Sequence, residues 1–327
     1  MLVNFPYVAI IDVGHGNSCL LYDNSKCFVI DCGLGSSIME FLKQEGLFEI
    51  HSVFLSHSDQ DHIGGLIGLI SSNEFIIHNV YAIADAKKST HLWDGILYSL
   101  SHSSMSGGTK LHVSLTTSEG PFKCGSIVLK VVSPTPYLAG KSSGNTTRKG
   151  EKITSNSMSA SFHVEWNDNS IVYLAGDIDQ VSLNDLIEHN VSLESPVLVF
   201  PHHGGKSGEY DVVNFTKALC NLTKATTVLF SIGRNKLLNP KPEVVYTVRS
   251  IIPDVRIACT QLSRNCANNL PKITSYHLLS CFAKGKANRE CCAGTFIIKL
   301  GDVIEYLPNR VSHQTFIDNF APTALCR

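Results

Sequence analysis

Residues 55–65 read Leu-Ser-His-Ser-Asp-Gln-Asp-His-Ile-Gly-Gly, and this stretch carries the strongest chemical signal in the chain. It continues the apolar run 51–55, which is typical of a buried strand, so its polar residues belong to a loop that leaves the edge of a sheet. Four metal-competent side chains fall within six positions: His57, Asp59, Asp61 and His62. We therefore predict that this loop binds metal.

The ligand types and their spacing indicate which metal ions, and how many, the loop could bind. Imidazole and carboxylate ligands without thiolate suit Zn²⁺, Mn²⁺ or Fe²⁺. His57 and Asp59 can point the same way from an extended backbone, and Asp61 and His62 supply a second pair on the following turn, so one or two cations could be held. The two glycines at 64 and 65 permit a tight turn and the start of a helix near residue 66. The alternative, a polar loop with a capping aspartate, explains such a dense cluster poorly.

Two further polar groups follow apolar runs. Asp177 ends a strand-like run, where a carboxylate can bridge two cations across a water. His202 and His203 follow the run 196–200, and paired histidines there suit a metal ligand beside a general acid or a phosphate contact. We predict Asp61, His202 and His203 as catalytic residues and His203 as a ligand, although the sequence does not decide which of the two histidines binds the metal.

These blocks resemble the metallo-β-lactamase superfamily, whose signature is His-x-His-x-Asp-His, with Asp59 standing where the second histidine is usual. Within it they resemble the nuclease-like domain at the C-terminus of the competence protein ComEC and its stand-alone soluble relatives. The likeness spans roughly residues 5 to 300. Its other blocks, in the same order as in the family, lie at residues 11–18, 29–33, 156–159, 174–177, 201–205 and 231–235.

The resemblance implies a fold and a set of supporting residues. It implies an α/β chain folded as an αββα sandwich, two mixed β-sheets flanked by helices, in one domain over residues 1–327 with a Cys-rich portion at about 256–300. Asp31 matches an aspartate that braces the metal loop without binding metal. The expected substrate contacts are His15, Asn156, Ser159, Lys206, Arg234 and Asn239. Asn239 stands where the family segment ends in histidine, so the number of bound cations stays open.

Charge and composition limit how a substrate could be attracted. The chain has 327 residues, 43% of them hydrophobic, and 27 basic against 28 acidic residues give a net charge of −1. Nucleic acid would therefore not be attracted globally, and phosphate binding has to be local. The loop 140–150 offers Lys141, Arg148 and Lys149 for that purpose, with an ordinary solvated loop as the alternative.

Neither a basic leader with an apolar core nor an apolar run of membrane-spanning length is found in the sequence, so we expect a cytoplasmic protein without a membrane partner. Eleven cysteines scattered over such a chain indicate reduced thiols. Cys259, Cys266, Cys291 and Cys292 could form a structural zinc site, against the alternative of buried free thiols.

Taken with the resemblance, these features favour a metal-dependent hydrolase, a phosphodiesterase or nuclease that acts on DNA or RNA through a metal-activated water, with one or two Zn²⁺ or Mn²⁺ ions as cofactor. One alternative is a hydrolase of small esters, lactones or thioesters, because one fold hosts many chemistries. Another is a degenerate metal-binding module that serves as a protein partner in a multi-component assembly, such as a phage-defence system. The oligomeric state is left open.

Overall fold

Runs rich in valine and isoleucine from both ends of the chain form the first of two sheets. The computed structural model describes residues 4–327 apart from 84–89, 207, 209, 235–236 and 272–276, so the last residue of the block at 231–235 lies outside the described residues. Within the described part, the first sheet has the strand order β15-β14-β1-β2-β3-β4-β5-β6. Its strands are β1 (Tyr7–Ile10), β2 (Cys19–Asp23), β3 (Lys26–Ile30), β4 (Glu49–Leu55), β5 (Ile76–Ala82), β6 (Lys110–His112), β14 (Phe296–Lys299) and β15 (Glu305–Leu307).

The second sheet comes from the middle of the chain and is also mixed. Its order is β13-β12-β11-β10-β9-β8-β7, with β10 to β13 parallel and the others antiparallel. Its strands are β7 (Phe122–Cys124), β8 (Ile127–Ser133), β9 (Ser161–Trp166), β10 (Asn169–Leu174), β11 (Val197–Val199), β12 (Thr227–Phe230) and β13 (Arg256–Cys259).

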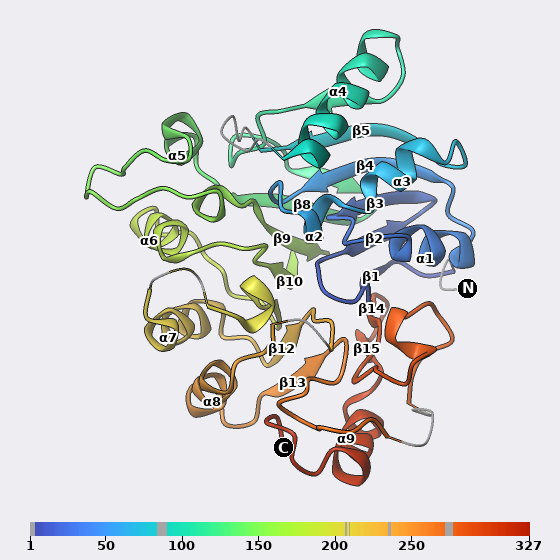
Figure 1. The fold of residues 1–327 in the computed structure, drawn as a ribbon, viewed down its shortest axis with the longest axis vertical. Helices are drawn as coiled ribbons and strands as arrows, with labels where there is room; N and C mark the ends of the chain where they lie inside the picture. Colours follow the sequence, from blue (N-terminus) through green and yellow to red (C-terminus); the bar gives the residue numbers. More distant parts are fainter. Residues whose placement is uncertain (1–3, 84–89, 207, 209, 235–236, 272–276) are drawn as a thin grey trace.

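Helices cover the outer face of each sheet. In Figure 1, α6, α7 and α8 lie along one flank and α1 and α3 along the opposite flank, with the strands between them. The described helices are α1 (Ser37–Glu45), α2 (Gln60–Ile63), α3 (Leu66–Ser71), α4 (His91–Met105), α5 (Pro136–Lys141), α6 (Gln180–Glu188), α7 (Val212–Thr223), α8 (Pro242–Ile251) and α9 (Arg310–Phe320), with short 3₁₀ turns η1 (Asn156–Met158), η2 (Pro201–Gly204) and η3 (Lys284–Lys286). None of these helices combines the length and the apolar character that crossing a bilayer requires.

Alternation along the strands separates three layers of core. In β1, Val8 and Ile10 face the second sheet, whereas Tyr7 and Ala9 face the helices on the outside. The central core lies between the sheets, a second core lies under α1, α3 and α4, and a third lies under α6 to α9. Four layers of secondary structure enclose these three cores. The predicted αββα sandwich is therefore confirmed.

The strand register brings the ends of several strands to one edge. Ile10 pairs with Cys19, Cys19 with Ile30, and Ile30 with Phe54, so β1, β3 and β4 all end beside one another. In the second sheet β10, β11 and β12 run parallel and end together in the same way. A backbone hydrogen bond of 2.6 Å from Ala160 to the carbonyl of Ser56 joins the two sheets at this edge. The segments that follow these strands therefore meet in space.

Candidate metal centre

A cavity of about 390 Å³ opens where the strand ends of the two sheets meet. It draws on the turn after β1, the loop after β4, the turn after β10 and the η2 turn after β11. The residues that line it are His15, Asp59, Asp61, Asn156, Asp177, His202, His203, Gly205, Lys206, Leu237, Asn239 and Lys241. Most of the side chains singled out from the sequence are thus brought to one place.

His57, His62 and Asp177 form one group of metal-competent atoms. One ligand atom from each lies within 4.8 Å of the others, and all three residues are buried. His57 Nε2 is 3.7 Å from Asp177 Oδ2, and His62 Nε2 is 3.5 Å from Asp177 Oδ1. Asp59, which is half-buried, adjoins the group with its Oδ2 atom 3.6 Å from His57 Nε2. Two imidazoles and a carboxylate are thereby presented to a single point.

Asp31 and Ser56 hold the two imidazoles of this group from behind. The carboxylate of Asp31 accepts hydrogen bonds from the Ser56 N–H and O–H groups and from His62 Nδ1, each at 2.7 Å. Because the Ser56 hydroxyl donates to Asp31, its oxygen accepts from His57 Nδ1 at 3.0 Å. Both histidines therefore carry a proton on Nδ1 and turn Nε2 toward the cavity, the orientation that metal-binding histidines adopt.

Asp31 thus occupies the supporting position that the resemblance implied, whereas Ser56 was missed in the sequence. Ser56 lies directly between the end of β4 and the first histidine of the loop. A small hydroxyl residue at such a place is a local signal that could have identified it. Its burial and its three side-chain contacts become visible only in the folded chain.

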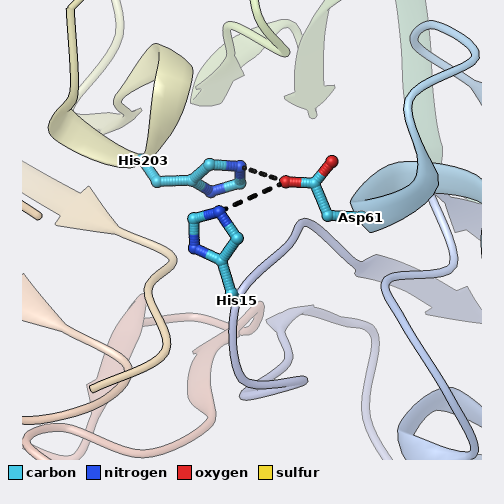
Figure 2. A group of neighbouring side chains, drawn as sticks. All are labelled: His15, Asp61 and His203. Atoms are coloured by element: carbon cyan, nitrogen blue, oxygen red, sulfur yellow. Dashed lines mark ion pairs between the residues drawn. The ribbon is translucent and has the colours of Figure 1, made fainter. Parts of the chain in front are cut away.

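A second group consists of His15, Asp61 and His203, which come from three distant parts of the chain (Figure 2). His15 Nε2 lies 3.4 Å and His203 Nε2 lies 3.2 Å from the same oxygen, Asp61 Oδ2. The rings of His203 and His62 are 5.5 Å apart between centroids, so this group adjoins the first. His15, expected as a substrate contact, lines the cavity and lies against Asp61.

The state of three buried imidazole nitrogens shows whether the site could hold a divalent cation. The Nε2 atoms of His57, His62 and His203 are buried and form no hydrogen bond with any described residue. Buried polar atoms are rarely left in this state, and each of these nitrogens faces a carboxylate at 3.2–3.7 Å. The donor set of imidazole nitrogens and carboxylate oxygens matches what Zn²⁺ or Mn²⁺ binds. The residues fit the metal that the fold implies.

The charges in the cavity are strongly coupled. Burial alone lowers the pKa of His62, but the carboxylates of Asp177 and Asp31 outweigh it and raise that pKa to about 10. Burial alone raises the pKa of Asp61, yet the neighbouring imidazoles of His203 and His62 bring it well below its usual value. The pKa of Asp177 is likewise well below normal, because His62 and His202 outweigh its burial. Both carboxylates are therefore ionised at neutral pH.

The structure separates the roles of the paired histidines. His203 Nε2 joins the second group, while His203 Nδ1 donates to the carbonyl of Ser231 at 2.7 Å. His202 instead anchors Asp177: its backbone N–H donates to Asp177 Oδ1 at 3.1 Å, and its Nε2 atom lies 3.1 Å from the carbonyl of Ile178. Burial lowers the pKa of His202, but Asp177 raises it to a net value above normal.

Two of the expected substrate contacts are corrected. Ser159 is fully buried, and its hydroxyl oxygen accepts the backbone N–H of Asp177 at 3.0 Å, so it positions that carboxylate. Arg234 is buried, and its guanidinium donates to backbone carbonyls of residues 262, 267 and 268 at 2.6–3.0 Å. These bonds stabilise the loops after β13 and leave the guanidinium turned away from the cavity, where the sequence pattern had suggested a phosphate contact.

Asn156, Lys206 and Asn239 line the cavity as expected. Asn239 is also structural, because its amide nitrogen donates to the carbonyl of His202 at 3.3 Å and so supports the η2 turn. Lys241, which the sequence pattern did not single out, adds a second cation beside Lys206 at the cavity.

The basic loop lies over a different cavity, of about 250 Å³, that Tyr137 and Glu188 help to line. Lys149 Nζ is 2.8 Å and Arg148 Nη2 is 3.5 Å from the carboxylate of Glu188. Lys141 lies at the end of α5. One acidic residue therefore offsets part of the positive charge that the loop sequence displays.

The C-terminal cysteines form buried contacts of another kind. Neither group of metal-competent atoms found in the described residues contains a cysteine. Cys291 Sγ donates to Asp12 Oδ2 at 3.4 Å, and Cys292 Sγ contacts His313 Nε2 at 3.2 Å. All eleven cysteines are unbridged, and all except Cys326 are buried. The geometry favours the free-thiol alternative over the structural zinc site for Cys259, Cys266, Cys291 and Cys292.

Comparison with known sequences gives a family. The sequence model of the metallo-beta-lactamase superfamily matches residues 11–178 of the 327. The structure is similar to the metallo-beta-lactamase fold protein YhfI from Bacillus subtilis, with 12% identity and a TM-score of 0.49 over 78% of this chain and 96% of that one.

Two other solved structures are similar at the same level. One is Igni18, a metallo hydrolase from Ignicoccus hospitalis, with 16% identity and a TM-score of 0.45 over 77% of this chain and 94% of that one. The other is unliganded yeast PDE1, with 11% identity and a TM-score of 0.48 over 79% and 98% of the two chains. A search of curated proteins found no match.

Proposed function

Because the chain belongs to the metallo-β-lactamase superfamily, whose members are metal-dependent hydrolases, we propose that it hydrolyses phosphodiester bonds in DNA or RNA. His57, His62 and Asp177 would hold a Zn²⁺ or Mn²⁺ ion, with Asp59 beside them. Such an ion lowers the pKa of a coordinated water and stabilises the charge that develops on the phosphoryl oxygens.

The side chains around this group have separate tasks in the proposal. Asp31 and Ser56 keep the Nε2 atoms of the two histidines directed at the cavity. Ser159 and His202 hold Asp177 in place through the hydrogen bonds to its backbone and its carboxylate. Lys206 and Lys241 supply positive charge at the cavity, where a phosphate group of the substrate would lie.

The polar lining of the cavity is the observation that favours a phosphodiester substrate over an apolar lactone or thioester. Among its described lining residues, Leu237 alone has a purely hydrocarbon side chain, and the others are histidines, carboxylates, amides, lysines and a glycine. A lactone or thioester with an apolar acyl chain requires a closed apolar pocket, since such ligands bind by burying hydrocarbon surface. An open polar cavity with two lysines suits a phosphodiester instead.

The proposal is tested with the purified protein in Zn²⁺ or Mn²⁺. We expect cleavage of single-stranded DNA, plasmid DNA or RNA and of a chromogenic phosphodiester, abolished in His57→Ala and Asp61→Ala. His78→Ala is the matched control, because His78 is half-exposed on β5 and pairs with Glu49 away from the cavity. Hydrolysis of esters, lactones or thioesters alone would replace this proposal with the small-molecule alternative.

Protein that binds metal and cleaves none of these substrates would instead point to a metal-binding partner module. The closer likeness to the ComEC nuclease-like domain, a cytoplasmic location, and a role beside a protein partner in phage defence belong to the same proposal. The block order in the sequence, with Asp59 in the position of the second histidine, supports the likeness, and the location and the role in defence follow from that likeness alone.

A further inference from the structure

Two consecutive leucines, Leu237 and Leu238, are exposed at the edge of the candidate metal cavity, and we call them the leucine pair. Leu237 lines the cavity and is 67% exposed, and Leu238 follows it with 50% exposed. The other described residues that line the cavity are polar or are glycine. A single exposed leucine is ordinary, but an adjacent pair at the edge of a site is typical of a surface that contacts a ligand.

The backbone of the leucine pair has a conformation that leucine rarely adopts. The φ angle is 52° at Leu237 and 48° at Leu238, which places both residues in the left-handed region. In that region Cβ crowds the following carbonyl oxygen, so glycine and asparagine are the usual residues there. Strained residues of this kind occur most often at binding sites and persist where their surroundings fix them. The two hydrocarbon side chains are thus kept at a cost in stability, and burial offsets little of that cost.

Hydrogen bonds from neighbouring segments fix the leucine pair beside the cavity. The ammonium of Lys241 donates to the carbonyl of Leu237, and the amide of Asn265 donates to the carbonyl of Leu238, each at 2.8 Å. The backbone N–H of Lys241 also donates to the carbonyl of Gly204 in the η2 turn at 2.9 Å. Lys241 lines the cavity too, so a cationic group and an apolar surface lie side by side there.

We infer that Leu237 and Leu238 bind the face of an unpaired nucleobase beside the phosphodiester that is cleaved, so that the substrate is a single-stranded nucleic acid. The inference deepens the proposed function and rests on it. A nucleotide joins an anionic phosphate to a base with two flat faces, which matches the ammonium of Lys241 beside the leucine pair. In a duplex those faces are covered by stacked neighbours, whereas a base of a single strand can turn out against apolar side chains.

Oligonucleotide binding tests the inference separately from catalysis. The full chain loaded with Zn²⁺ is titrated into fluorescent strands with phosphorothioate linkages, which keep the negative charge and resist hydrolysis, and binding is followed by anisotropy. One strand is oligothymidylate, and the other has the same length and charge but abasic residues. Because contact with a base face contributes to affinity independently of phosphate, we expect wild type to bind oligothymidylate roughly tenfold more tightly.

The double variant Leu237→Asn/Leu238→Asn should bind the two strands equally, and each single variant should lose part of the preference. Asparagine removes the hydrocarbon surface and tolerates a positive φ, so the unfolding midpoint should stay the same or rise, whereas a purely structural role of the leucines would lower it. Val303→Asn is the matched control and should keep the preference. Val303 is 74% exposed in the turn between β14 and β15, at the opposite end of the first sheet from the cavity.

The outcomes separate this inference from the proposed function. Equal binding of the two strands by wild type, an unchanged preference in the folded double variant, or tighter binding of a duplex than of a single strand would overturn the inference. Cleavage of DNA or RNA by wild type would then leave the proposed function standing. Base-dependent binding without hydrolysis of any phosphodiester would overturn the proposed function alone.

Discussion

Replacing Asp31 with asparagine should weaken metal binding even though Asp31 belongs to neither ligand group. The carboxylate accepts three hydrogen bonds of 2.7 Å, from the N–H and O–H of Ser56 and from His62 Nδ1. An asparagine retains one acceptor oxygen and turns an NH₂ group toward at least one of these donors. Its backbone conformation should survive, because asparagine tolerates the positive φ of 57° at this position.

The expected size of the effect follows from these contacts. With the Nδ1 partner weakened, His62 loses the fixed orientation and the basicity that Asp31 provides. Loss of such a supporting partner typically lowers metal affinity by roughly 10–100-fold, or about 1.4–2.8 kcal/mol. The hydrogen bond to the charged carboxylate also stabilises the folded chain by about 1.5–3 kcal/mol, so the unfolding midpoint should fall as well.

Competition between the protein and a chromogenic chelator for Zn²⁺ measures the affinity. Asp23→Asn is the matched control, because Asp23 is a buried carboxylate that accepts the N–H and O–H of Ser126 in the same manner but at the β2–β3 hairpin. It should destabilise the fold without changing metal affinity. Equal affinities of Asp31→Asn and wild type, or an equal loss in Asp23→Asn, would refute the positioning role of Asp31.

Three further predictions concern the cavity edge, the basic loop and the C-terminal core. Asp59→Asn removes a half-exposed charge near His57 Nε2 and should lower metal affinity roughly tenfold without lowering the unfolding midpoint of metal-free protein; a lower metal-free midpoint would show that Asp59 is structural. Glu188→Gln removes the ion pairs to Arg148 and Lys149, so it should tighten DNA binding and steepen the salt dependence of that binding. Hydrolysis of a small chromogenic phosphodiester should stay unchanged. An unaltered salt dependence would show that the loop is an ordinary solvated surface. Burial, together with nearby cationic groups, lowers the pKa of His313 to about 3. Between pH 6.5 and 3 the unfolded chain therefore binds a proton that the folded chain does not bind, so the stability of the fold falls as the pH falls. At pH 5 this lowers the free energy of unfolding by about 2 kcal/mol relative to neutral pH. In His313→Gln, denaturant unfolding should show a loss between neutral pH and pH 5 that is smaller by this amount, and a pH dependence equal to that of wild type would contradict the prediction.

The sequence by itself determined the family, the sandwich and the core of the candidate metal site. These features depend on local patterns: apolar runs that end in polar residues, and four ligands packed into the six positions 57–62. When such runs form neighbouring parallel strands, their carboxyl ends meet at one edge, so the convergence of Asp177 and His203 on the metal loop could be expected. Asp31 and Lys206 follow parallel strands to this edge in the same way, whereas Asn156 precedes β9, which is antiparallel to β10 and therefore begins at this edge.

Only the tertiary structure decided which side chain each polar group contacts. His15 reaches Asp61 because the register of β1, β2, β3 and β4 places two distant turns side by side. Arg234 turns away from the cavity because it donates to three backbone carbonyls within residues 262–268, and Glu188 offsets part of the charge of the basic loop from another helix. Such partners lie far apart in sequence, and their pairing depends on sheet register and layer packing, which no local pattern encodes.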